Sequence, residues 1–97
     1  MKELNELILK AKKKDEKAME ALIVQFMPLL KARAKKIARW GLEYDDVFQQ
    51  ASLIFILSVY EYKEIPPVTF AGYLKKRMDW NLWAYCRKEL KQKGENN

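Results

Sequence analysis

Five aromatic and basic side chains near the C-terminus have the types and spacing needed to bind a nucleic-acid strand. Tyr73, Lys76, Trp80, Trp83 and Arg87 follow one another at intervals of three or four residues. At about 100° per residue these positions share one face of an α-helix, so rings alternate with cations. Rings stack on unpaired bases, at about 1–3 kcal/mol per base, and cations bind phosphates. This aromatic-basic stripe therefore predicts a surface for single strands.

The other side of the same predicted helix is apolar and would hold it against a core. Its inward positions are Phe70, Leu74, Met78, Leu82 and Tyr85. Packing of this side would leave both tryptophans in solvent. In the alternative interpretation, Trp80 and Trp83 flank a broad helical core and the cations form an ordinary solvated face.

Length and charge limit the class of protein. The 97 residues, 49% of them hydrophobic, suffice for one small domain. A formal net charge of +6 favours a polyanionic partner. The charges are uneven: residues 21–42 carry cations and no acid, whereas residues 43–64 carry five acids against Lys63 alone. The cations are Lys31, Arg33, Lys35, Lys36 and Arg39, and the acids are Glu43, Asp45, Asp46, Glu61 and Glu64. Two oppositely charged surfaces predict two partners, and ordinary charge scatter is the alternative.

The chain lacks the side chains that most enzymes and metal sites use. It has no histidine, and Cys86 is its only cysteine. The commonest general base, a disulfide framework and a zinc-ligand spacing are therefore all missing. We expect no enzyme activity, no metal site and no cofactor. The N-terminal residues have no uninterrupted apolar run for a signal peptide or membrane span, so we expect a cytoplasmic protein without a membrane partner.

Helical periodicity extends over nearly the whole chain and predicts an all-α fold, a small bundle of about four helices. After a first helix within residues 1–14, Asp15 is a predicted N-cap for the second. Pro28 either begins another helix or kinks a continuous one, and Gly41 is a candidate C-cap.

The two remaining helices are separated by a stiff connection. Asp45 is the predicted N-cap of a third helix over residues 46–62. No helix can cross the Ile-Pro-Pro-Val sequence of residues 65–68. Thr69 then caps the helix that carries the stripe, which we expect to fray over residues 91–94.

The third predicted helix is apolar on two sides. Its inward positions are Phe48, Ala51, Ile54, Phe55, Ser58 and Tyr62, and its far side carries Asp46, Gln49, Leu53, Ile56, Leu57 and Tyr60. Either the helix is central and covered on both sides, or its second face binds another protein. In the second case an apolar patch would be rimmed by Asp46, Gln49 and Gln50.

The order of motifs resembles region 2 of bacterial sigma factors of the sigma-70 type. In the segment of that region that docks on RNA polymerase, a Gly-Leu, an aromatic residue, an Asp, two aliphatic residues and a Gln-Glu pair occur in this order. Here they correspond to Gly41-Leu42, Tyr44, Asp46, Val47-Phe48 and Gln49-Gln50. Residues 68–90 are similar to the promoter-melting and promoter-recognition helix, with its Phe-x-x-Tyr core at Phe70 and Tyr73. The resemblance covers residues 15–93 of a single domain, and we expect residues 94–97 to be a disordered tail.

The resemblance implies a transcription-initiation module with two partners. Bound to core RNA polymerase, it would hold the non-template strand of the minus-ten promoter element as the DNA opens, with a flipped base near Tyr73. The implied DNA contacts are Tyr73, Lys76, Arg77, Trp80, Trp83 and Arg87. The implied contacts with the clamp helices of the largest polymerase subunit are Asp46, Gln49, Gln50, Leu53 and Ile56.

Departures from the family pattern leave alternatives open. Gln50 stands where the family usually has Glu, and Lys76 and Arg77 replace paired tryptophans of primary sigma factors. Trp80 and Trp83 would then supply the wedge between the DNA strands. A region 4-like domain is missing from this sequence, so the chain is either a fragment of a longer factor or works with a separate partner. In the second case it is a split-sigma coregulator that mainly docks on polymerase beside a separate region 4-like protein. An anti-sigma factor is a further candidate partner. A third hypothesis is a protein-binding helical module whose tryptophans form an oligomer interface.

Overall fold

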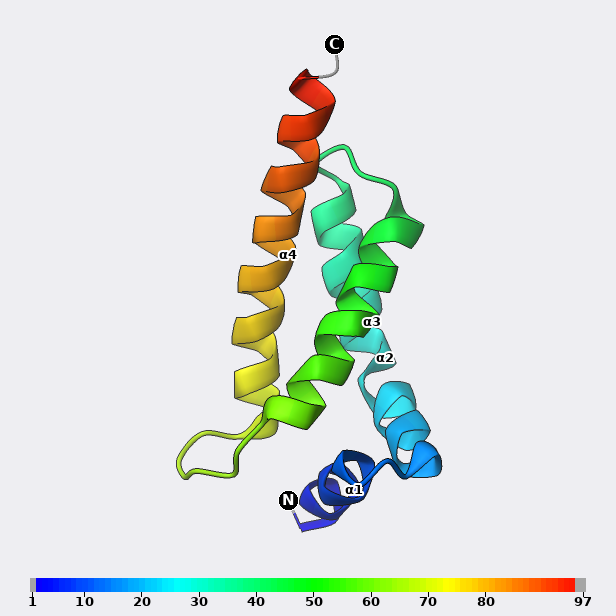
Figure 1. Ribbon diagram of the computed structural model, residues 1–97, viewed down its shortest axis with the longest axis vertical. Helices are drawn as coiled ribbons and strands as arrows, with labels where there is room; N and C mark the ends of the chain where they lie inside the picture. Colours follow the sequence, from blue (N-terminus) through cyan, green and yellow to red (C-terminus); the bar gives the residue numbers. More distant parts are fainter. Residues whose placement is uncertain (1, 96–97) are drawn as a thin grey trace.

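Four helices make up the fold, as Figure 1 shows for this computed structural model, which describes residues 2–95 and the side chains of residues 3–92. They are α1 (Lys2–Lys12), α2 (Glu16–Ala38), α3 (Tyr44–Glu61) and α4 (Phe70–Glu95). Helices α2, α3 and α4 lie side by side with alternating direction, and α1 packs across the end where α2 begins and α3 ends. The predicted all-α bundle of about four helices is confirmed. None of the helices in the described residues is long and apolar enough to cross a membrane.

Side-chain caps fix the start of α2, whose end differs from the prediction. The Asp15 carboxylate accepts a hydrogen bond of 3.1 Å from the Ala18 amide, which confirms the predicted N-cap. Pro28 lies inside one continuous helix. The C-cap is Arg39 and not Gly41. Gly41 comes two residues later, in the turn toward α3, with φ +108°, a conformation that favours glycine.

Helix α3 begins two residues earlier than expected, and α4 ends later. Tyr44 is the first residue of α3 and Glu43 its N-cap, without a side-chain cap, so the prediction of Asp45 as N-cap is wrong. Asp45 instead lies in the first turn, where a carboxylate interacts favourably with the helix dipole. The predicted cap at Thr69 is confirmed by a hydrogen bond of 3.1 Å from the Gly72 amide to its hydroxyl oxygen.

The C-terminal part of α4 is helical where fraying and a tail were predicted. The helix continues through residues 91–94 and ends at Glu95, because Leu90 still packs against the core. Residues 96–97 of the predicted tail lie outside the described residues.

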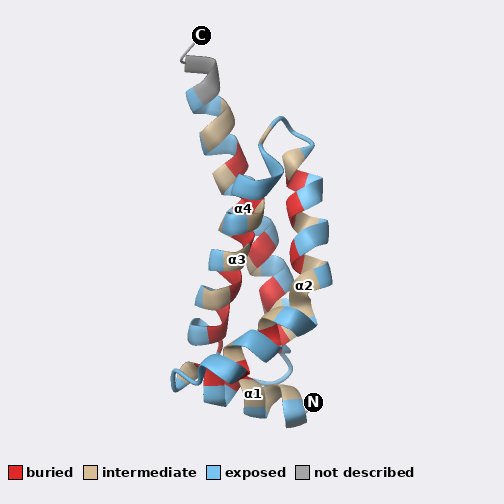
Figure 2. Cartoon of the chain, turned by 90° about the vertical axis from the view of Figure 1, so that its right-hand side faces the viewer, coloured by how far each residue is buried: buried red, intermediate tan, exposed pale blue. Residues whose placement is uncertain are grey.

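The core lies between the helices, and its buried residues face inward (Figure 2). At its centre the ring of Phe26 lies 5.6 Å from that of Phe55 and 5.4 Å from that of Phe70. On α4 the buried row advances by four residues at each step, through Phe70, Leu74, Met78, Leu82 and Cys86. The expected inward position of Tyr85 is thus corrected: Tyr85 is only half-buried, because the i+4 row brings Cys86 to the core.

Helix α3 contacts all three other helices, yet one of its sides stays open. Leu53 is 50% exposed and Leu57 is 42% exposed, so the alternative of a helix covered on both sides is wrong. Ile56 departs from the predicted far side, because it is half-buried and packs against the core. Ser58 is fully buried, and its hydroxyl donates to the Ile54 carbonyl at 2.7 Å.

Candidate nucleic-acid interface

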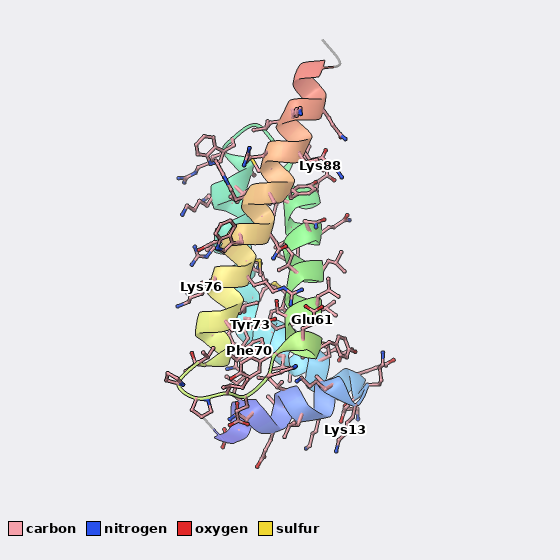
Figure 3. The ribbon with its side chains drawn as sticks, turned by 60° about the vertical axis from the view of Figure 1, so that its left-hand side comes forward. Lys13, Glu61, Phe70, Tyr73, Lys76 and Lys88 are labelled. Carbon is pink, nitrogen blue, oxygen red and sulfur yellow. The ribbon has the colours of Figure 1, made fainter. Side chains whose placement is uncertain are left out.

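The stripe on α4 faces solvent. Trp80 is 74% exposed and Trp83 is 43% exposed, and neither belongs to the buried core. Lys76 and Arg87 are exposed as well, and Figure 3 shows Lys76 pointing away from the bundle. Because Trp80 leaves most of its surface in water, it does not behave as a residue that flanks a core. The stripe therefore offers rings and cations to a ligand.

Trp80 lies between two hollows in the surface. The first has a volume of about 740 Å³ beside the connection between α3 and α4, and we call it the loop hollow. It is lined by Pro67, Val68, Thr69, Gly72, Tyr73, Lys76, Arg77 and Trp80. The second, the tryptophan cleft, has a volume of about 500 Å³ between α2 and α4. It is lined by Arg33, Lys36, Ile37, Trp40, Asp79, Trp80 and Trp83. Both volumes are in the range of about 300–1,000 Å³ that is typical of small-ligand sites.

Two of the predicted DNA contacts are held by neighbouring side chains. The Tyr73 ring is half-buried and tilted against that of Tyr62, at 5.5 Å between centroids. Its hydroxyl accepts a hydrogen bond of 2.7 Å from the Arg77 guanidinium, which also pairs with Glu61 of α3. Burial favours the neutral form of Arg77, but the hydrogen bonds to Glu61 and Tyr73 outweigh it and raise its pKa. Arg77 thus positions Tyr73 and is less available to DNA than Lys76.

Residues of α1 and the core hold the connection that forms the rim of the loop hollow. The Tyr62 hydroxyl donates to the Val68 carbonyl at 3.1 Å. From α1, the Asn5 amide donates to the Glu64 carboxylate at 2.9 Å, and the Lys12 ammonium donates to the Tyr62 carbonyl. These contacts fix both ends of the connection, so the hollow has a defined wall. No sequence pattern predicted this role of α1.

Trp40 is a candidate site residue that the sequence analysis missed. It is 57% exposed, and its ring stands at 76° to that of Trp83 with centroids 5.7 Å apart. Arg33 and Lys36 lie on the same side of α2, at helical intervals of seven and four residues before it. That spacing repeats the pattern of rings and cations on α4, and it was the available signal.

A second surface lies on the open side of α3. Among the predicted polymerase contacts, Asp46, Gln49 and Leu53 are exposed, whereas Gln50 and Ile56 are half-buried. The other exposed apolar residues on this side are Leu57 and Tyr60. The helix therefore presents an apolar strip with polar and acidic residues at its N-terminal end.

Ionisable groups near the end of α4 have altered proton affinities. Burial, followed by the negative charges of Glu89 and Asp46, raises the pKa of Tyr85. Burial also raises the pKa of the Cys86 thiol, which makes it a poor nucleophile at neutral pH. Within residues 2–95 no group of three or more acidic, cysteine or histidine side chains is placed to hold a metal ion.

We compared the chain with known protein families, curated proteins and solved structures. No family model, no curated protein and no solved structure matches this chain. What bears on its function is the all-α bundle itself, with an aromatic and basic surface on α2 and α4 and an apolar, partly acidic surface on α3.

Proposed function

We propose that this chain is a non-catalytic transcription-initiation module, similar to region 2 of sigma-70-type factors. It binds core RNA polymerase and captures the non-template strand of the minus-ten promoter element. The observation that carries the proposal is Trp80, an indole 74% exposed between two hollows on a helix that also presents Lys76 and Arg87. The order of sequence motifs from Gly41 to Tyr73 supports the same function.

In this proposal, rings and cations of α4 have different tasks. Trp80 and Trp83 stack on unpaired bases, and Lys76 and Arg87 contact phosphates along the strand. A flipped base enters the loop hollow, where Arg77 holds the Tyr73 ring in place. Flipping costs a few kcal/mol, which one or two stacking contacts at about 1–3 kcal/mol each can offset.

The α3 surface supplies the contact with polymerase. An exposed apolar strip with a charged rim is typical of a protein interface, and here Leu53 and Leu57 leave 50% and 42% of their surfaces in solvent. The resemblance assigns this face to the clamp helices of the largest subunit. The interface would place α3 between the polymerase and the DNA-binding helix α4.

The DNA part is tested by fluorescence anisotropy with a labelled minus-ten oligonucleotide, single-stranded and as a duplex, at one ionic strength. We expect the single strand to bind at least about fivefold more tightly, because only unpaired bases can stack. Trp80→Ala should remove this preference, and Trp80→Phe, which keeps a ring, should retain much of it. Equal binding of single strand and duplex would contradict the proposal. Concentration-dependent self-association without DNA binding would instead favour an oligomer interface.

The polymerase part is tested by pull-down with purified core enzyme. Leu53→Glu should weaken the complex while the circular dichroism stays helical, because Leu53 is half exposed. Val24→Glu adds the same charge at an exposed apolar position of α2 and serves as the matched control. If Leu53→Glu unfolds the domain, or if both variants weaken the complex equally, the assignment of the α3 face is wrong.

A split-sigma coregulator is the second candidate, and one observation favours it. Two of the six predicted DNA contacts, Tyr73 and Arg77, are held by neighbours inside the bundle, whereas the α3 strip is open. Such a chain would mainly dock on polymerase while a region 4-like protein supplies promoter recognition. Transcription that requires added region 4-like protein, together with weak DNA binding by this chain, would favour this candidate.

A further inference from the structure

The tryptophan cleft between α2 and α4 joins two of the predicted DNA contacts, Trp80 and Trp83, to a ring and charges that the prediction did not include. Trp40 lies in the α2–α3 connection, directly after the C-cap Arg39, and Trp83 and Trp80 come from α4. The edge-to-face contact of Trp40 with Trp83 fixes the two rings relative to each other, yet Trp40 remains 57% exposed. The cleft therefore has an aromatic wall that is open to solvent.

The charges around the cleft favour an anionic, planar ligand. Arg33 is half-buried and pairs with Asp79 through one guanidinium nitrogen, at 2.8 Å. Its other N–H groups remain available to an acceptor. Lys36 is exposed and forms no hydrogen bond or ion pair with the described residues. A nucleotide whose base stacks on the indoles and whose phosphate lies at Lys36 would match both the aromatic wall and the positive charge of the cleft.

We infer that the tryptophan cleft is a second base-binding site, which carries the single strand from α4 onto the C-terminal part of α2. This inference rests on the proposed function and extends it to Trp40, Arg33 and Lys36. Because Trp80 lines both the loop hollow and the cleft, it separates two bases of one strand. Trp40 stacks on the base that enters the cleft, and Lys36 contacts its phosphate.

The test uses the full chain and a labelled oligothymidylate of about 12 nucleotides, long enough to cover both hollows. Trp40→Ala should lower its affinity by about fivefold or more, and Trp40→Phe should retain most of it because a ring remains. A bromouracil-substituted oligonucleotide should also cross-link to Trp40 or Trp83 in the wild-type chain. Thermal unfolding of each variant shows whether the loss of the Trp40–Trp83 contact changes the fold.

Failure of this inference differs from failure of the proposed function. If Trp80→Ala weakens binding while Trp40→Ala does not, the strand avoids the cleft and only the present inference is overturned. If the wild-type chain does not bind the oligothymidylate, both the proposed function and the proposed base-binding site in the cleft are overturned. A Trp40→Ala variant that unfolds is replaced by Trp40→Phe with Lys36→Ala, and unchanged affinity and an absent cross-link in that variant overturn the inference.

Discussion

Lys76 and Arg77 are adjacent cations on α4, and their surroundings predict that removing Lys76 affects DNA binding whereas removing Arg77 affects the stability of the fold. Lys76 is exposed and forms no hydrogen bond or ion pair with the described residues, so Lys76→Ala should remove a phosphate contact without harming the fold. Arg77 donates to the Tyr73 hydroxyl and pairs with Glu61. Arg77→Ala should therefore destabilise the bundle and loosen the Tyr73 ring.

The magnitudes follow from the contacts. For single strands, each lost phosphate contact lowers the slope of log affinity against log salt by about 0.7, the value we expect for Lys76→Ala. The Arg77–Tyr73 hydrogen bond contributes about 1 kcal/mol, and the pair with Glu61 adds little because the Glu61 side chain is 56% exposed. In a domain of this size, about 1 kcal/mol lowers Tm by about 4–8 °C.

Anisotropy titrations at several salt concentrations, together with thermal unfolding by circular dichroism, separate the two effects. Lys75→Ala is the matched control, because it removes the same charge from an exposed position of α4 outside the stripe. The reasoning is refuted if Lys75→Ala lowers the salt slope as much as Lys76→Ala. It is also refuted if Arg77→Ala lowers the slope by about 0.7 while Tm is unchanged.

Three further predictions concern stability. Leu74→Ala should cost about 2–5 kcal/mol in urea unfolding because Leu74 is fully buried, whereas Trp80→Ala should change it by less than about 0.5 kcal/mol. Asp15→Ala should cost about 1 kcal/mol in the same assay through loss of the α2 cap, and no change would contradict the cap. The Tyr85 pKa is raised above 10.0, so the unfolded chain loses this proton first and stability should fall as pH rises above that value. Tyr85→Phe should reduce this alkaline loss in unfolding curves, and an unchanged loss would contradict the assignment.

The helices were predictable from the sequence because each carries a clear apolar period. The caps at Asp15 and Thr69 were predicted correctly, and so were the buried α4 positions Phe70, Leu74, Met78 and Leu82, whereas Cys86 takes the place expected for Tyr85. Helix ends were less predictable, since they depend on tertiary contacts. Asp45 has the right type for a cap, but the chain direction set by the turn at Gly41 starts α3 at Tyr44.

The candidate site was predictable only in part, because its hollows form between separate elements. The stripe lies on one helix, and its exposure followed from the period. The tryptophan cleft needs Trp40, which follows the end of α2, beside Trp83 from α4, a pairing that no local pattern contains. In the same way, the engagement of Arg77 by Glu61 joins the end of α3 to α4. Such partners depend on how the helices pack, not on the spacing along one of them.

The exposure of the two α4 tryptophans is a consequence of the core, but their identity is not. The i+4 row from Phe70 to Cys86 fixes the rotation of α4 about its axis. Positions 80 and 83 then lie on the opposite side, where any polar helix-forming residue would satisfy the fold equally well. Trp80 exposes most of its indole to water without stabilising the bundle. Trp83 and Trp40 contact each other edge to face, yet they leave 43% and 57% of their surfaces exposed. Folding therefore leaves Trp80 unexplained and explains the other two rings only by their contact with each other. The ligand proposed above, with flat faces and negative charge, would account for all three together with the cations beside them.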